Sequence, residues 1–369
     1  MAMSLPSATA ALGGPPTTDA LAALGLLNAV ALRVIGGRFI SWSDPVQAAL
    51  VFGVAPSTLD ELAVAFDGPS MRVREIAGRA SAGSHAPYRT LVRTRSGMLL
   101  EERRGPGSIA DAVIVFRPLM GDAPALGADD EDLEQLSAAL GEGRAFVALQ
   151  PIVDAQTRAV ARYECLLRLR GRDGATLAPA RFVEAAERAG MAGTLDLAAL
   201  DLGLAAQSIV NAPVAVNVSG GTLADQSATD AFLSRVQAAG ADVARNLTVE
   251  ITETFALNDF ARCRAFADDL RSLGARLALD DFGAGYTSLR TLRTLSLDEV
   301  KIDGSYVRDV AIRGDQQLFV RALRDLASGL GLSTVAEHVA DPADAAHLRA
   351  IGVDHLQGYL FGAPQAVAA

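Results

Sequence analysis

Apolar and polar positions follow two different patterns along the 369-residue chain. From about residue 133 onward, short apolar strands alternate with helical segments, an order that is typical of α/β proteins. The predicted strands are FVALQPIVD, VARYECLLRL, PVAVNVS, NLTVEITET, ARLALDDFG, EVKIDGSYV, STVAEHV and HLQGYLFG. Helical periodicity marks most connections: Pro179 to Ala189, Leu195 to Ile209, Asp259 to Leu273 and Gln316 to Leu330. This pattern favours a closed, TIM-like (β/α)8 barrel over an open sheet.

Two connections refine this prediction. The short turn AQTRA joins the first two strands, which predicts a hairpin and therefore one antiparallel strand in the barrel. Asp341 followed by Pro342 predicts the N-cap and first turn of the last helix.

The first 132 residues lack this alternation. Residues 1–18, rich in Ala, Gly, Pro, Ser and Thr, predict a disordered leader, and residues 19–120 predict a small α+β domain. Its expected elements are a helix from Asp19 to Leu32, a strand from Arg38 to Trp42, a helix from Asp44 to Phe52, and strands in Tyr88 to Gly97 and Asp111 to Leu119. Residues 121–132 predict a linker or the start of a connecting helix, and residues 133–369 the barrel.

Composition excludes several classes of function. Half of the residues are hydrophobic and 21% are charged, so a sizeable core is expected. The net charge of -10 argues against binding a nucleic-acid polymer, although a small phosphate ligand held through metal ions remains compatible with it. The two cysteines form no CxxC pair, which favours a reducing compartment. The longest apolar run, Ala20 to Leu32, is too short to span a bilayer, so we expect a cytoplasmic protein without a membrane segment.

Polar side chains recur where the predicted strands end. They are Glu164, Asn217, Glu250, Asp280, Asp281, Lys301, Glu337 and Gln357. A barrel gathers the carboxyl ends of its strands around one mouth, so these residues are expected to meet. Hard divalent cations such as Mg²⁺ or Mn²⁺ prefer oxygen ligands of this kind. Two such ions bridged by a shared carboxylate would form a site for phosphoryl hydrolysis.

The adjacent carboxylates in LDDFG need a special backbone. Side chains alternate between the two faces of a strand, so Asp280 and Asp281 share one site only where the strand gives way to loop. That is where the glycines begin, at Gly283 and Gly285.

Taken singly, several of these residues have simpler interpretations. Glu164 fits a buried partner of Arg168, and Asn217 with Ser219 fits a polar turn. Lys301 also fits a surface position, and Glu337 fits a partner of a neighbouring base. The recurrence of polar residues at the same place on successive strands is what favours a shared site.

Residues 133 to 362 resemble the EAL family of cyclic-di-GMP phosphodiesterases. The resemblance rests on QPIVD followed by YECLLR, on DFGAGYTSL, and on the ordered residues at the strand ends. It implies a (β/α)8 barrel of the EAL type that hydrolyses cyclic-di-GMP to linear pGpG with two Mg²⁺ or Mn²⁺ ions. It also implies metal ligands at Glu164, Asn217, Glu250, Asp280, Asp281 and Glu337.

The same resemblance assigns further roles. Lys301 corresponds to the catalytic lysine that orients the attacking water, and Glu253 to the glutamate that braces the loop after Asp281. The expected substrate contacts are Arg168, Gln150 and Gln357. Because family members often dimerise through the barrel, a homodimer is expected.

Three positions depart from the family pattern. Cys165 stands for an alanine, which is a small change at a buried position. In VAEHVA, His338 replaces a glycine and Ala340 replaces a second glutamate near the metals. These departures leave open a second class of function, in which a catalytically degenerate EAL protein acts as a cyclic-di-GMP receptor or as a protein-interaction scaffold.

The N-terminal segment weakly resembles a PAS sensory domain, through FISWSDPVQAALVFG and YRTLVRTRSGMLLEERRG. This resemblance implies a regulatory domain without identifying its signal. An HD-type phosphodiesterase is excluded, because none of the four histidines is followed by aspartate.

Overall fold

The computed structural model describes residues 29–35, 38–80, 88–96, 98–104, 113–119, 128–252, 260–283, 292 and 295–367. Glu253, the leader and most of the DFGAGYTSL loop therefore lie outside the described residues. The chain divides into two compact units. One contains the described residues up to Ala145 together with Leu169–Leu195 and Asp225–Ala231, and the other contains Phe146–Arg168, Asp196–Ala224 and the described residues from Phe232 onward.

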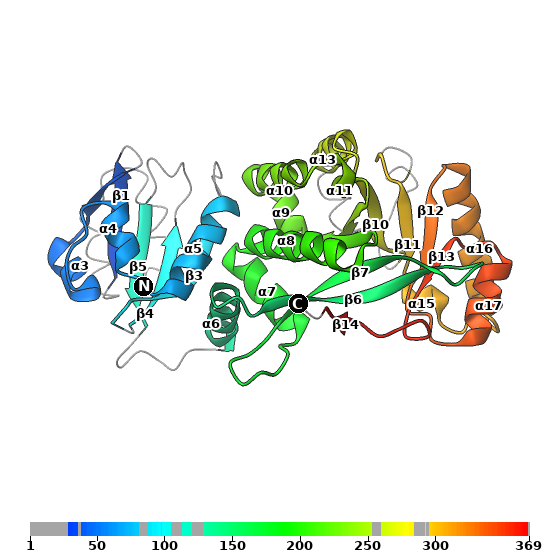
Figure 1. Ribbon diagram of the computed structural model, residues 1–369, viewed down its shortest axis with the longest axis horizontal. Helices are drawn as coiled ribbons and strands as arrows, with labels where there is room; N and C mark the ends of the chain where they lie inside the picture. Colours follow the sequence, from blue (N-terminus) through cyan, green and yellow to red (C-terminus); the bar gives the residue numbers. More distant parts are fainter. Residues whose placement is uncertain are drawn as a thin grey trace, which may run out of the picture. The chain divides into compact units, whose positions relative to one another are not determined.

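The N-terminal part is an antiparallel sheet with helices, in the strand order β2-β1-β5-β4-β3 (Figure 1). Its elements are β1 (Val30–Ile35), β2 (Phe39–Trp42), α3 (Pro45–Phe52), α4 (Leu59–Val64), α5 (Gly68–Ala80), β3 (Tyr88–Arg93), β4 (Leu99–Arg104) and β5 (Val113–Pro118). Aromatic side chains fill one face of the sheet, with the ring centroids of Phe52 and Phe116 lying 5.2 Å apart. This architecture agrees with the predicted small PAS-like domain.

One predicted N-terminal element is wrong in its described part. The expected helix from Asp19 to Leu32 overlaps β1, where Val30 to Leu32 are strand residues paired with β5. The Ala/Leu run favours a helix locally, but Val30, Leu32 and Val34 alternate along the strand and are at most 1% exposed in the core. Burial between two partner strands outweighs the intrinsic helix propensity here. The sequence pattern gave no prediction for α4 or α5.

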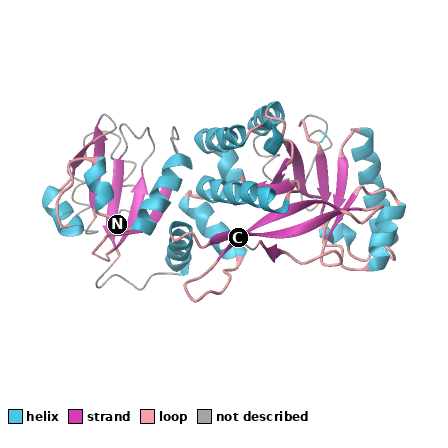
Figure 2. Cartoon of the chain, viewed as in Figure 1, coloured by secondary structure: helices cyan, strands magenta, loops and turns pink. Residues whose placement is uncertain are grey.

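The remaining elements alternate between strands and helices (Figure 2). The strands are β6 (Ala145–Asp154), β7 (Val160–Leu169), β8 (Val214–Val218), β9 (Leu247–Thr252), β10 (Arg276–Phe282), β11 (Glu299–Ile302), β12 (Ser333–Ala336), β13 (His355–Gln357) and β14 (Gln365–Ala366). The helices are α6 (Ala128–Gly141), α7 (Pro179–Ala189), α8 (Ala192–Val210), α9 (Gly220–Ala224), α10 (Gln226–Ala239), α11 (Ala241–Ala244), α13 (Phe260–Ser272), α15 (Gly304–Val307), α16 (Gly314–Gly329) and α17 (Pro342–Ala350).

Strands β6 to β13 close into the predicted barrel. Neighbouring strands pair in sequence order, and β13 returns to pair with β6. The β7–β8 pair and each successive pair up to β12–β13 are parallel, whereas β6 is antiparallel to β13. The predicted hairpin is present, because the Asp154 amide donates to the Ala159 carbonyl at the turn between β6 and β7. The expected N-cap is also present, since Asp341 accepts from the Ala343 amide at 2.6 Å.

Helix α8 is the one helix among the described residues that is long and apolar enough, by length and composition, to cross a membrane. Half of it is buried within the protein. At Gly203 it approaches β8 so closely that an added Cβ would lie 2.7 Å from Val216 Cγ1. These contacts are those of a helix that packs on a barrel.

Candidate active site

Lys301 lies inside the barrel at the carboxyl end of β11, and only 1% of the residue is exposed. Its ammonium Nζ is 2.7 Å from Glu250 Oε2, 2.9 Å from Glu337 Oε1, 3.0 Å from Asp280 Oδ1 and 3.6 Å from Glu164 Oε2. These carboxylates come from β9, from the end of β12, from β10 and from β7, as strand ends at one barrel mouth require. The alternative of a surface position for Lys301 is therefore wrong.

Amide side chains hold Glu164 from two sides. Asn217 Nδ2 donates to Glu164 Oε1 at 2.8 Å, and Gln357 Nε2 donates to Glu164 Oε2 at 2.6 Å. The same Gln357 nitrogen lies 3.2 Å from Gln150 Oε1. Arg168, in contrast, donates to the carbonyl of Leu167 at 2.9 Å. Glu164 thus belongs to the shared group, and Ser219, which donates to Asp196 at 2.7 Å, belongs to a turn beside it.

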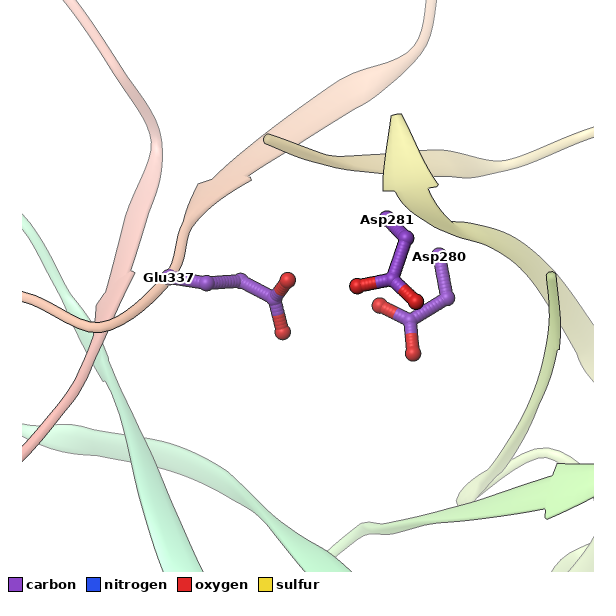
Figure 3. Close-up of side chains that lie close together, drawn as sticks. All are labelled: Asp280, Asp281 and Glu337. Atoms are coloured by element: carbon purple, nitrogen blue, oxygen red, sulfur yellow. The ribbon is translucent and has the colours of Figure 1, made fainter. Parts of the chain in front are cut away.

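A register shift explains how Asp280 and Asp281 share one site. The pairing of β10 with β11 is irregular between Leu279 and Phe282, and Asp281 adopts a left-handed φ of 54°. This bulge breaks the alternation of the strand and re-aims Asp281. Asp280, Asp281 and Glu337 each offer an oxygen within 4.8 Å of the others, and their carboxylates point toward a common space (Figure 3). The two carboxylates thus face one space, as LDDFG predicted, but the break is a bulge within β10, which continues to Phe282, and not the end of the strand.

A glycine keeps two of the site strands together. The Gln357 carbonyl accepts at 2.9 Å from the amide of Val339, two residues after Glu337. A Cβ at Gly358 would lie 2.1 Å from the Val339 carbonyl oxygen, so only glycine permits this backbone approach. The approach fixes Gln357 relative to Glu337.

Burial and mutual repulsion shift the acids of the site. Burial raises the pKa of Glu337 to about 8, and nearby Asp280 and Glu164 oppose the lowering effect of Lys301. Burial likewise raises the pKa of Glu250 well above 4.5, and burial with the charge of Asp280 raises the pKa of Asp281. Glu164 moves in the opposite direction, because Lys301 and the two amides outweigh its burial and lower its pKa. One ammonium thus does not neutralise the carboxylates around it.

The donor set fits divalent cations. Among the described residues, Glu250 Oε1 and Glu337 Oε2 are buried atoms without a hydrogen-bond donor. Buried oxygens of this kind cost free energy unless a proton or a cation satisfies them. Carboxylate and amide oxygens in this number are typical ligands of Mg²⁺ or Mn²⁺.

The site opens into a cleft of about 720 Å³. Its lining includes predicted residues, among them Gln150, Arg168 and Gln357. It also includes Leu166 and Tyr359, for which the sequence patterns gave no prediction. Tyr359 is 75% exposed. The signal in the sequence is an aromatic residue two positions after Gln357, a predicted substrate contact.

Both departures in VAEHVA also line this cleft. His338 has a left-handed φ of 55°, which is why a glycine suits this position. Its ring packs on Gly304, where an added Cβ would lie 2.7 Å from His338 Cγ and Nδ1. Ala340 is exposed in the cleft and contributes no oxygen ligand. Cys165 is buried beside α8, and burial raises the pKa of its thiol to about 12.

A family model for the EAL domain matches residues 133–364. The chain belongs to the EAL domain family. The cyclic di-GMP phosphodiesterase PdeB of Shewanella oneidensis is 33% identical over 241 residues, which cover 63% of this chain and 28% of that protein. The cyclic di-GMP phosphodiesterase NbdA of Pseudomonas aeruginosa is 34% identical over 244 residues, which cover 64% of this chain and 31% of that protein.

A solved structure of the PaMucR phosphodiesterase in complex with c-di-GMP has the same barrel, with a TM-score of 0.59 and 28% identity. The match covers 64% of this chain and 97% of that one. The match thus covers nearly all of that solved chain, whereas this chain spans under a third of the two curated relatives.

Proposed function

We propose that this EAL protein hydrolyses cyclic di-GMP to linear pGpG with the help of Mg²⁺ or Mn²⁺. The observation that carries the proposal is the group of four carboxylates around Lys301, which includes buried oxygens of Glu250 and Glu337 without a hydrogen-bond donor. Two proteins that this chain resembles, PdeB and NbdA, are named as cyclic di-GMP phosphodiesterases.

The residues divide the work by their chemistry. Glu164, Asn217, Glu250, Asp280, Asp281 and Glu337 would hold the ions. Bound divalent ions supply positive charge that polarises a phosphodiester and acidifies water. Once its carboxylate neighbours are neutralised, Lys301 is free to donate hydrogen bonds to the attacking water and to a phosphate oxygen. Arg168, Gln150 and Gln357 line the cleft where they can bind and orient the substrate.

The cleft offers one surface for a nucleobase. Tyr359 exposes its ring beside Arg168 and Leu166, and aromatic rings bind bases by stacking. A dinucleotide substrate therefore fits this cleft better than a small phosphate ester does.

Control by the N-terminal domain, dimerisation and a cytoplasmic location form part of the proposal. Ile312, at 81% exposure, and Leu318, at 73%, are the candidate contacts for dimerisation through the barrel. Sedimentation of the purified protein tests it, and a monomer at micromolar concentration contradicts it.

A catalytically degenerate receptor is the second candidate, and Ala340 favours it. Hydrolysis by the wild type in the presence of Mn²⁺ supports the enzyme. Tight binding by calorimetry without pGpG, together with turnover in Ala340→Glu, supports the receptor.

A further inference from the structure

A second polar layer lies directly beneath Lys301 and Glu164. Because side chains alternate along a strand, Glu299 on β11 and Arg162 on β7 face the same interior as Lys301 and Glu164, two positions earlier. Arg162 Nη2 donates to Glu299 Oε1, and these side chains are only 5% and 1% exposed. The ion pair is therefore buried within the barrel.

This ion pair joins opposite sides of the barrel. Strands β7 and β11 are separated by β8, β9 and β10 in one direction, and by β6, β13 and β12 in the other. The contact between Lys301 Nζ and Glu164 Oε2, at 3.6 Å, spans the same two strands one layer higher. Among the four contacts of the Lys301 ammonium with carboxylates, this one is the longest. Because it spans the barrel, its length depends on the distance between β7 and β11.

Glu299 also reaches the other strands of the site. Ser333 Oγ on β12 donates to Glu299 Oε2 at 3.0 Å. His355 Nδ1 on β13 lies 3.9 Å from the same oxygen, and these two strands lead into Glu337 and Gln357. Glu299 is thus a common partner of three strands that carry site residues.

Stability alone gives a weak reason for such a pair. Replacing a buried ion pair by apolar side chains of similar volume is often neutral for stability, whereas removing one partner is strongly destabilising. The ion pair fixes the relative positions of the two side chains, because its hydrogen bonds have a preferred length and angle. Apolar packing imposes no such preference.

We propose that Arg162 and Glu299 are positioning residues, whose cross-barrel ion pair sets the separation of β7 and β11 and thereby aligns Glu164 with Lys301. This inference rests on the proposed function of the site above it. Neither residue touches the substrate in this account, and both act through the strands that carry the ligands.

The decisive variant is the double substitution Arg162→Met/Glu299→Leu in the full chain. We expect the melting temperature and KM to be unchanged. We expect kcat to fall by about tenfold or more, and the Mn²⁺ affinity of the metal-free protein to fall by about tenfold, as for other groups that orient metal ligands. Arg162→Lys keeps the charge but loses the planar guanidinium. This variant should fold normally and show smaller losses of kcat and of Mn²⁺ affinity. The exposed ion pair between Arg235 and Asp201 provides the control. The double variant Arg235→Met/Asp201→Leu should change neither kcat nor the Mn²⁺ affinity.

Wild-type kcat and Mn²⁺ affinity in the double variant would overturn the proposal and leave the pair a purely structural role. If the double variant does not fold, Glu299→Gln replaces it, because this amide keeps the size of the side chain and can still pair with Ser333. A loss of Mn²⁺ affinity in folded Glu299→Gln supports positioning, and an unchanged affinity contradicts it. If the wild type fails to hydrolyse cyclic di-GMP, the proposed function fails, while the Mn²⁺ titration still decides the role of the pair.

Discussion

The ammonium of Lys301 lies 2.7 Å from Glu250 Oε2, at the centre of a group of acids that repel one another. Glu250 is fully buried, and burial raises its pKa well above 4.5, so its charged form is unfavourable without metal ions. Glu250→Gln should therefore stabilise the metal-free protein at pH 7, by about 1 kcal/mol. The same change removes an oxygen that we propose as a metal ligand. It should lower kcat by more than about a hundredfold, because even the outer partners of metal ligands cost up to that much.

Chemical denaturation in EDTA and initial rates in Mn²⁺ measure these two effects. Glu187→Gln on the exposed side of α7 is the matched control and should leave both unchanged. A Glu250→Gln protein that is less stable and fully active would contradict the site as described.

The second prediction concerns Gly304 and the left-handed His338. An added Cβ at Gly304 would lie 2.7 Å from His338 Cβ, Cγ and Nδ1, atoms too close to the backbone to move aside. Gly304→Ala should therefore destabilise the protein by about 1–3 kcal/mol, the usual cost of overpacking. His338→Gly removes the ring and suits the φ of 55°, so the double variant should recover most of that loss. Equilibrium unfolding of the wild type, the two single variants and the double variant measures the interaction between the two positions. Additive losses of unfolding free energy would show that the two positions do not interact.

The third prediction concerns Tyr359 at the cleft. Its ring is 75% exposed, so its removal should not affect folding. Stacking on a base is worth about 1–3 kcal/mol, so Tyr359→Ala should raise KM for cyclic di-GMP by about tenfold and leave kcat nearly unchanged. Tyr359→Phe keeps the ring and serves as the control. An unchanged KM in Tyr359→Ala would exclude stacking at this position.

The fourth prediction concerns pH and Glu101 in the N-terminal domain. Its side chain is fully buried, with Arg89 at 2.5 Å, Arg117 at 2.7 Å and Arg103 at 2.8 Å. Burial alone would raise the pKa of Glu101, but these arginines outweigh it and hold the pKa below 4.5. The unfolded chain then takes up a proton more readily than the folded domain. The stabilisation by Glu101 is therefore complete above about pH 4.5, the pKa of the unfolded chain. It is lost as the pH falls through the lower pKa that Glu101 has in the folded domain.

Glu101→Gln removes the carboxylate that Arg89, Arg103 and Arg117 share, and should cost about 3 kcal/mol at pH 7. The difference from wild type should shrink at pH 3. Trp42 packs in this domain against Phe52 at 5.5 Å, and as the single tryptophan of the chain it reports the unfolding by fluorescence. A difference that is the same at pH 7 and pH 3 would show that the charge of Glu101 does not stabilise the fold.

The positions of the site residues were predictable from the sequence because a polar residue interrupts each apolar strand near its carboxyl end, as at Glu250 in β9 and Lys301 in β11. The alternation of side chains also required a break in the strand at Asp281, and the structure has a bulge there. The predicted strand EVKIDGSYV, by contrast, ends at Ile302, because Asp303 caps the short helix α15 and accepts from the Ser305 amide at 2.9 Å. An N-cap of this kind ends a strand regardless of the apolar residues that follow.

Other features depended on contacts between residues that are distant in the sequence. Nothing in the neighbourhood of Arg162 or Glu299 indicates that the two meet, because they lie 137 positions apart and come together only when the barrel closes. Val30 and Leu32 likewise became strand residues through pairing with β5, whose residues lie more than 80 positions along the chain, as for Leu32 and Ile114.

We propose that the acids around Lys301 form a working phosphodiesterase site. Its most direct test is incubation of the purified full chain with cyclic di-GMP and Mg²⁺ or Mn²⁺, with separation of the products by chromatography. We predict that pGpG forms, that EDTA abolishes its formation, and that Lys301→Met and Glu250→Gln prevent it without unfolding the protein. Absence of pGpG at every metal concentration, with folded protein and bound cyclic di-GMP, would contradict the claim and identify a receptor.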